Sequence, residues 1–245
     1  MKMRILTVLA ALALSSNSFA ATGGSDNASD VVYNDGLGSG DNGGSGFNAW
    51  VIAPAGNGGT FILSSVGQGF GNVDTTGEAF GFYGNTTGGD GVNADRTFAG
   101  GALTIGQSFS IDLAINFRNG NKGIDLDVGG AGVWNFNTGG DLYTVNGVDL
   151  GWVFSSTSVF ELTVTATGVA SYDISLVRGT DTFNQSYANG GSGIDGFGLY
   201  EFGTEAGDSN NLFANNLEVV PEPSTMVMAL MGAIGLVAAR RRLQK

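Results

Sequence analysis

The 245-residue chain contains no cysteine and no histidine. Without cysteine it forms no disulfides, so its stability must come from a hydrophobic core, which about 200 residues can supply. Without histidine it cannot build a Ser-His-Asp or Cys-His nucleophile system, a histidine-ligated metal site or a haem site. Paired carboxylates, as in glycoside hydrolysis, and all-oxygen calcium sites remain open.

Basic residues are also scarce. The segment 21–220 carries 21 acidic residues and only four basic ones, which gives it a formal charge of −17. Nucleic acid and anionic lipid are therefore not expected as partners, because binding to phosphates needs a basic face. The acidity serves either solubility alone or the binding of divalent cations.

The first 20 residues have the pattern of a secretory signal peptide. Lys2 and Arg4 precede an apolar run over 5–14, and Ser18 and Ala20 place small side chains at the two positions that signal peptidase reads. The sequence predicts an exported protein whose mature chain begins near Ala21. A retained N-terminal anchor is the alternative.

The last 25 residues combine three features in order: Pro221-Glu222-Pro223, an uncharged apolar run over 226–239, and Arg240-Arg241-Arg242. As a helix the run covers about 21 Å, short of the ~30 Å hydrocarbon core. The arginines place the C-terminus on the cytoplasmic side, which puts the body outside. A buried C-terminal helix is the alternative.

This tail resembles the PEP-CTERM sorting signal of surface and secreted proteins from Gram-negative bacteria that make exopolysaccharide. The resemblance implies that a membrane-embedded exosortase recognises Pro221, Glu222 and Pro223 while residues 226–239 are transiently inserted in the membrane. Arg240, Arg241 and Arg242 would act as the stop. The protein would then be cut near the motif and reside in the cell envelope, at the cell surface or in the extracellular matrix.

The segment between the two signals is typical of an all-β domain. The whole chain has 43 glycines and three prolines, and 21–220 shows no sustained helical spacing. Apolar residues alternate with polar ones over 108–117 and 123–128, joined by Asn119-Gly120, which predicts a hairpin. A second hairpin is predicted from 158–166 and 170–176. Further strands are expected at 49–52, 60–64, 78–83, 141–145, 151–154, 197–202 and 212–219.

So many short strands in about 200 residues predict one antiparallel β-sandwich, a large jelly roll rather than a seven-stranded immunoglobulin-like domain. Several stretches also resemble uncharacterised exported PEP-CTERM proteins whose bodies are similar to concanavalin-like sandwiches. This second resemblance implies a fold and no activity. It rests on 26–29, Tyr33, 43–47, Trp50 and 211–219.

Aromatic residues are the candidates for binding a polysaccharide. A tryptophan face packs on the C–H groups of a sugar ring while nearby Asp and Asn side chains bind its hydroxyls. Trp134, flanked by Asn135, is the first candidate. Packing in the core is the alternative for each. The candidate set is Trp50, Trp134 and Trp152, with Tyr83, Tyr143 and Tyr200.

Two sets of carboxylates could carry other chemistry. Asp125 and Asp127 share one strand face at about 6.5–7 Å, a spacing that suits a hard cation or an acid/base pair. The sequence lacks the Glu-x-Asp-x-x-Glu or Glu-x-Asp-x-Glu strand of concanavalin-like glycosidases, and neither Glu161 nor Glu201 has a second carboxylate two residues away. We therefore expect no enzymatic activity. The acidic segments 26–30 and 90–95 suggest calcium or solvated loops. A matrix protein, a carbohydrate-binding module and a glycosidase remain as functions.

Overall fold

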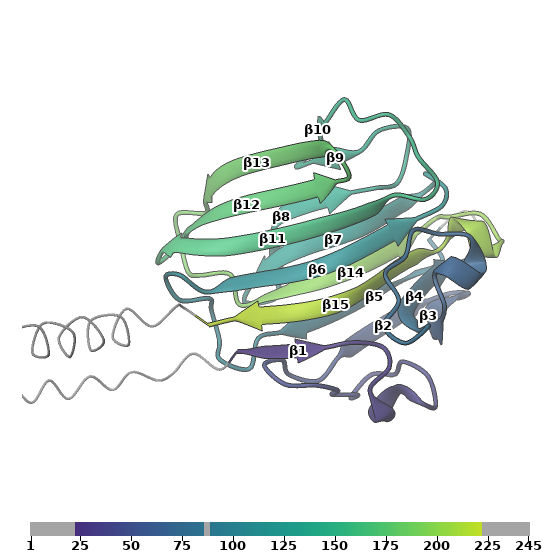
Figure 1. Cartoon of the computed structure of the whole chain (residues 1–245), viewed down its shortest axis with the longest axis horizontal. Helices are drawn as coiled ribbons and strands as arrows, with labels where there is room; N and C mark the ends of the chain where they lie inside the picture. The colour runs from purple at the N-terminus through teal and green to yellow at the C-terminus, as the bar shows by residue number, and fades with distance from the viewer. Residues whose placement is uncertain (1–22, 86–88, 222–245) are drawn as a thin grey trace, which may run out of the picture.

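The computed structural model describes residues 23–85 and 89–221, which form two antiparallel sheets packed face to face (Figure 1). Among these residues the only helices are three short 3-10 turns, so the all-β sandwich expected from the sequence is confirmed. The turns are η1 (Val31–Tyr33), η2 (Val66–Gln68) and η3 (Asp208–Asn210).

The larger sheet has eight strands. In spatial order they are β13 (Asp181–Ala188), β12 (Ser171–Arg178), β11 (Val159–Gly168), β6 (Ser108–Ile115), β15 (Leu212–Val220), β4 (Ala79–Gly84) and β3 (Gly58–Leu63), with β1 (Gly24–Asp26) also paired to β15. The second sheet has seven: β10 (Val148–Asp149), β9 (Thr144–Val145), β8 (Ala131–Asn137), β7 (Asn121–Val128), β14 (Gly196–Phe202), β5 (Gly91–Thr97) and β2 (Val51–Ala55).

The core lies between the sheets and is filled by the apolar half of each alternating strand. On β6 the residues at 109, 111, 113 and 115 are fully buried, and on β11 the same holds for Phe160, Leu162 and Val164. The rings of Phe109 on β6 and Phe197 on β14 stack across the sandwich with centroids 4.8 Å apart. The period-two pattern therefore identified the buried faces of these strands.

The two predicted hairpins have different outcomes. Strands β11 and β12 pair as expected, with Leu162 opposite Leu176. The hairpin through Asn119-Gly120 is wrong, because β6 belongs to the eight-stranded sheet and β7 to the seven-stranded sheet. Residues 116–120 carry the chain from one sheet to the other. Periodicity shows which face of a strand is buried but does not show which strand lies beside it.

Other differences concern which segments form strands. The segment expected as an acidic loop at 90–95 belongs mostly to β5, where Asn93 and Asp95 point outward while Val92 and Ala94 are buried. Strands β8 and β13 were not predicted, and 151–154 forms no strand. Strand β13 lies at the edge of its sheet and is mostly polar, so its alternating signal is weak.

The described chain begins and ends at the same end of the sandwich, since Gly24 pairs with Val219. Pro221 is exposed and is the last described residue of its motif. The signal peptide, Glu222, Pro223, the apolar run 226–239 and the three arginines lie outside the described residues. Within the described part of the chain, no helix has the length and apolar character needed to cross a membrane.

Candidate functional site

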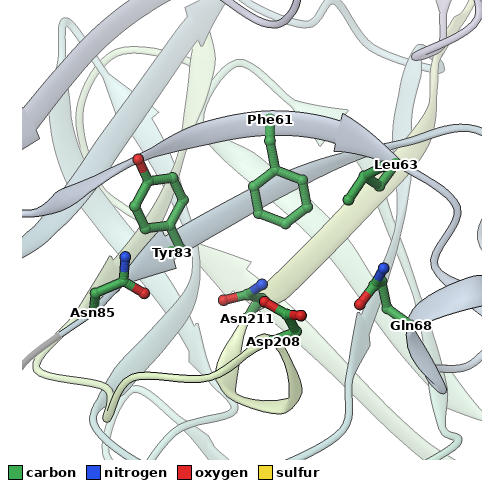
Figure 2. Close-up of a pocket in the computed structure, with 7 residues that line it drawn as sticks. All are labelled: Phe61, Leu63, Gln68, Tyr83, Asn85, Asp208 and Asn211. Atoms are coloured by element: carbon green, nitrogen blue, oxygen red, sulfur yellow. The ribbon is translucent and has the colours of Figure 1, made fainter.

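A pocket of about 220 Å³ opens on the outer face of the eight-stranded sheet, beside its edge strand β3 (Figure 2). Its wall combines two aromatic rings, one leucine, three amides and one carboxylate. The aromatic and aliphatic side chains come from β3 and β4, and the polar ones come from the ends of neighbouring loops. The lining residues are Phe61, Leu63, Gln68, Tyr83, Asn85, Asp208 and Asn211.

Glycines on the facing strands make room for both rings. Phe61 on β3 pairs with Gly81 on β4, and Tyr83 on β4 pairs with Gly59 on β3. A Cβ at Gly81 would lie 2.2 Å from the Phe61 ring, and one at Gly59 would lie 2.7 Å from the Tyr83 hydroxyl. Each ring thus lies flat over its neighbouring strand because that strand carries no side chain there.

A small second hydrophobic core packs against the Phe61 ring and holds it in place. The Phe61 ring meets Phe213 of β15 edge-on at 5.4 Å, and Phe213 in turn meets Phe70 at 4.7 Å. Tyr83 lies 6.0 Å from Phe61 at an angle of 40°. Such aromatic pairs favour defined orientations, so the rings form a fixed wall with partly exposed faces.

The polar side of the pocket faces these rings. In Figure 2, Asn211 and Asp208 lie opposite Phe61, with Gln68 and Asn85 to either side. No described residue hydrogen bonds to the side chains of these four residues. Asn211 is 6% exposed, so its amide sits at the bottom of the pocket. An apolar wall opposite free amide and carboxylate groups suits a ligand with C–H faces and hydroxyl edges.

The tryptophans singled out from the sequence lie elsewhere. Trp50 and Trp134 are each 1% exposed, so neither ring presents a face at the surface. Their indole N–H groups donate to Tyr33 and to Gln185, which is how buried tryptophans are usually satisfied. Trp152 is partly buried and stacks on Phe160 at 6.4 Å.

The three tyrosines named with them divide between the core, the second sheet and the pocket. Tyr143 is fully buried in the main core, whereas Tyr200 is partly exposed on β14. Tyr83 lines the pocket. The sandwich uses its largest rings to fill the space between the sheets, so the exposed platform comes from smaller aromatics.

The carboxylates Asp125 and Asp127 do share the outer face of β7, on the opposite side of the molecule from the pocket. Gly198 on β14 lies between Asp125 and Asp95 in one cross-strand row. A Cβ at Gly198 would be 2.6 Å from Asp95 and 3.6 Å from Asp127, so both carboxylates crowd over this glycine. The amide of Asn135 donates to Asp125 at 2.7 Å.

Burial, together with the neighbouring carboxylates of Asp95, Asp125 and Asp195, raises the pKa of Asp127 to about 7. Burial also raises the pKa of Asp125, which the bond from Asn135 partly opposes. Asp95 has a raised pKa as well, from burial and then from Asp125. The pKa values of all three carboxyl groups are therefore raised, and that of Asp127 reaches about 7.

The remaining acidic candidates have structural partners. Asp26 is 1% exposed and contacts the Arg96 guanidinium and, at 2.5 Å, the Tyr33 hydroxyl, so 26–30 is not an open calcium loop. Glu201 is buried and accepts from the backbone of Leu212 and from Thr204, and burial raises its pKa to about 7. Glu161 is exposed on β11. Residues 23–85 and 89–221 contain no group of three or more carboxylates arranged to hold a metal.

The comparison with known families bears on the C-terminus. The family model of the PEP-CTERM protein-sorting motif matches residues 219–242. The chain carries a PEP-CTERM sorting motif. The motif indicates an exported protein of the cell envelope, and its match begins at Val219, within β15, so the motif follows the body without a linker. No curated protein matches the sequence.

The solved structures that match this fold have low sequence identity to the chain and low TM-scores. A carbohydrate esterase of the Shiga toxin-encoding bacteriophage phi24B is 13% identical over 70% of this chain and 90% of its own, with a TM-score of 0.45. The receptor-binding domain of botulinum neurotoxin D is 12% identical over 75% of this chain, with a TM-score of 0.40. A serotype D ligand-binding domain in complex with N-acetylneuraminic acid is 14% identical over 71%, with a TM-score of 0.39. This chain spans less than half of the two neurotoxin domains, 47% and 43%.

Proposed function

We propose that this protein is a surface or matrix component of a Gram-negative bacterium, sorted by an exosortase, whose body binds an exopolysaccharide in the Phe61 and Tyr83 pocket. Signal peptidase would remove the N-terminal segment and the exosortase the C-terminal one. The side chains that line the pocket support the proposed binding, and the sorting motif supports the proposed location.

The observation that supports carbohydrate is the pairing of two ring faces with four polar side chains that make no hydrogen bond to any described residue, all in one hollow. Sugar rings stack on aromatic faces, and amides and carboxylates bind hydroxyl groups at their edges. At about 220 Å³ the pocket is smaller than the ~300–1,000 Å³ of drug-sized sites, which favours one sugar unit or a chain end over a long segment.

A glycosidase is the alternative, and the raised pKa of Asp127 beside Asp125 is the observation that favours it. A glycosidase needs one protonated and one ionised carboxyl group on either side of the scissile bond. The pocket and these carboxylates, however, lie on the outer faces of different sheets. One sugar unit cannot contact both, so we propose a binding protein without hydrolytic activity.

The proposal is tested with the purified full chain on the exopolysaccharide of its host, by calorimetric titration and by release of reducing sugar. We expect binding without hydrolysis, and loss of binding in Phe61→Ala and Tyr83→Ala. Phe117→Ala is the matched control, because Phe117 is an exposed ring, 53% accessible, outside the pocket. Equal binding by all variants would refute the pocket as the binding site. Release of sugar that Asp127→Asn abolishes would support the glycosidase alternative.

A further inference from the structure

One end of the sandwich collects both ends of the described chain. Val220 of β15 pairs with Ser108 of β6, and Ser108 pairs with Thr165 of β11, so the loops beside these residues share that end (Figure 1). Gly24 of β1 lies there too, opposite Val219. We call this the terminal end; it comprises 23–25, 98–107, 129–130, 169–170, 189–195 and 220–221.

The terminal end is nearly free of charge although the body is strongly acidic. Its described segments contain one charged residue, Asp195, whose carboxylate accepts a hydrogen bond from the backbone of Gly129 at 2.9 Å. The connections at the opposite end hold six charged residues within 89–90, 116–120, 138–158 and 203–211. Charge is therefore distributed unequally between the two ends of one molecule.

Exposed apolar side chains lie on the loops of the terminal end. Ile105 is 54% exposed and Val169 is 80% exposed, and with Leu103 they line a shallow apolar hollow. Backbone hydrogen bonds hold their loops in place, from Leu103 to Ile194 at 2.9 Å and from Gly106 to Ala166 at 2.7 Å. The exposed apolar groups thus belong to fixed loops, and such exposed patches commonly mark an interaction surface.

The sorting motif brings this end close to the membrane. The apolar run begins at residue 226, five residues beyond Pro221. Five extended residues span at most about 18 Å. When the run is in the bilayer, the terminal end must lie within that distance of the lipid surface. Bringing charged loops there would cost desolvation free energy, which uncharged loops avoid.

We propose that the terminal end is a membrane-contact surface. Ile105 and Val169 enter the interface of zwitterionic lipid, which has no net charge, while the tail holds the protein at the membrane. The acidic body disfavours anionic lipid as the partner. The inference deepens the proposed sorting function and rests on its membrane-held tail. It assigns a fixed orientation to the body, with the pocket facing sideways from the membrane.

The absence of cysteine makes the test direct. Single-cysteine variants Ile105→Cys and Val169→Cys of the full chain are labelled with an environment-sensitive fluorophore and reconstituted in phosphatidylcholine vesicles that contain a lipid-borne quencher. Thr180→Cys, exposed in the β12–β13 turn at the opposite end, is the control for the body. Ala233→Cys, within the apolar run, reports whether the tail is inserted.

We expect a shift to shorter wavelength and quenching at positions 105, 169 and 233, and neither at 180. Quenching at 233 alone would overturn the contact surface while leaving the membrane-held tail intact. Absence of quenching at 233 would overturn both. A shift at 105 and 169 without vesicles would mean that the tail itself covers the hollow, and it too would overturn the proposal.

A second set of variants tests the apolar side chains themselves. With the label at position 169, Ile105→Asp should reduce quenching by lipid because it places a charge in the interface. Val153→Asp is the matched control, since Val153 is 81% exposed in a connection at the opposite end. Equal quenching in Ile105→Asp and Val153→Asp would contradict a role for Ile105.

Discussion

Phe61 lies across Gly81, and the ring occupies the space where any other residue at position 81 would place its side chain. The same arrangement recurs two residue pairs along the two strands, where Tyr83 lies across Gly59. The pocket wall therefore depends on two residues that contribute no side chain of their own. A sequence signal does exist: glycine stands two positions before the aromatic residue in both strands, at Gly59 and Phe61 and at Gly81 and Tyr83.

Replacing Gly81 with alanine should move the Phe61 ring and weaken ligand binding. The new Cβ would lie 2.2 Å from the ring, so the ring must rotate away from the wall. Overpacking of this kind costs about 1–3 kcal/mol of unfolding free energy. Chemical denaturation and calorimetric titration measure the two effects. Gly191→Ala is the control, because no atom lies within 4 Å of the added methyl group; equal behaviour of both variants would contradict the arrangement.

Trp134 should matter for folding and not for ligand binding. Its ring is almost fully buried, and its N–H donates to Gln185 at 3.0 Å. Removing a large buried side chain typically costs about 3–5 kcal/mol, so Trp134→Ala should melt at a much lower temperature. Replacing the partly buried Trp152 with alanine should lower the unfolding free energy by less. A Trp134→Ala protein with unchanged melting and lost polysaccharide binding would instead restore the tryptophan as a binding residue.

The carboxylate row should make stability depend on pH in a defined direction. The pKa of Asp127 is raised to about 7 in the folded body, against about 4 for an ordinary aspartate. The folded state thus holds this proton more tightly than the unfolded chain, and stability falls as pH rises from about 4 to 7. Each tenfold difference in proton affinity between the two states corresponds to about 1.4 kcal/mol of unfolding free energy.

Asp127→Asn should therefore raise the unfolding free energy at pH 8, by on the order of 2 kcal/mol if the neighbours keep their places. Its stability should also vary less between pH 4 and 7. Denaturation curves across this range give both quantities. Asp173→Asn is a suitable control, because Asp173 is exposed on β12 and lies in the other sheet. A larger pH dependence in Asp127→Asn than in the unaltered protein would contradict the assignment.

The sequence was informative for strands in which apolar and polar residues alternate over many positions. Alternation identified the inner residues of β6 and β11 because the core selects apolar side chains at every second position. It could not give strand order, which depends on contacts between distant segments. The pocket was missed for that reason: it needs β15, β4 and β3 to be adjacent, which brings Asn211 beside Phe61. Tyr83 was singled out only as one aromatic residue among several.

Processing of the C-terminus should leave the folded body intact. The ladder of β15 ends with Val220 opposite Ser108, so a cut beyond Pro221 removes no described strand pairing. We expect the intact mass of the exported protein, made in a host with an exosortase, to show an N-terminus near Ala21 and loss of the segment after the Pro221-Glu222-Pro223 region. Its melting temperature should match that of the uncut chain in detergent.

Two variants separate sorting from plain anchoring. Deletion of residues 226–245 should release the body unsorted, because in the proposed sorting the exosortase reads the signal while the membrane holds it. Replacing Arg240, Arg241 and Arg242 with alanine should also impair retention, since positive charges keep this end on the cytoplasmic side. Fractionation followed by mass spectrometry measures both effects. A mature surface protein that still ends at Lys245 would show that the tail is a permanent anchor, because an exosortase substrate loses that residue with the rest of the signal.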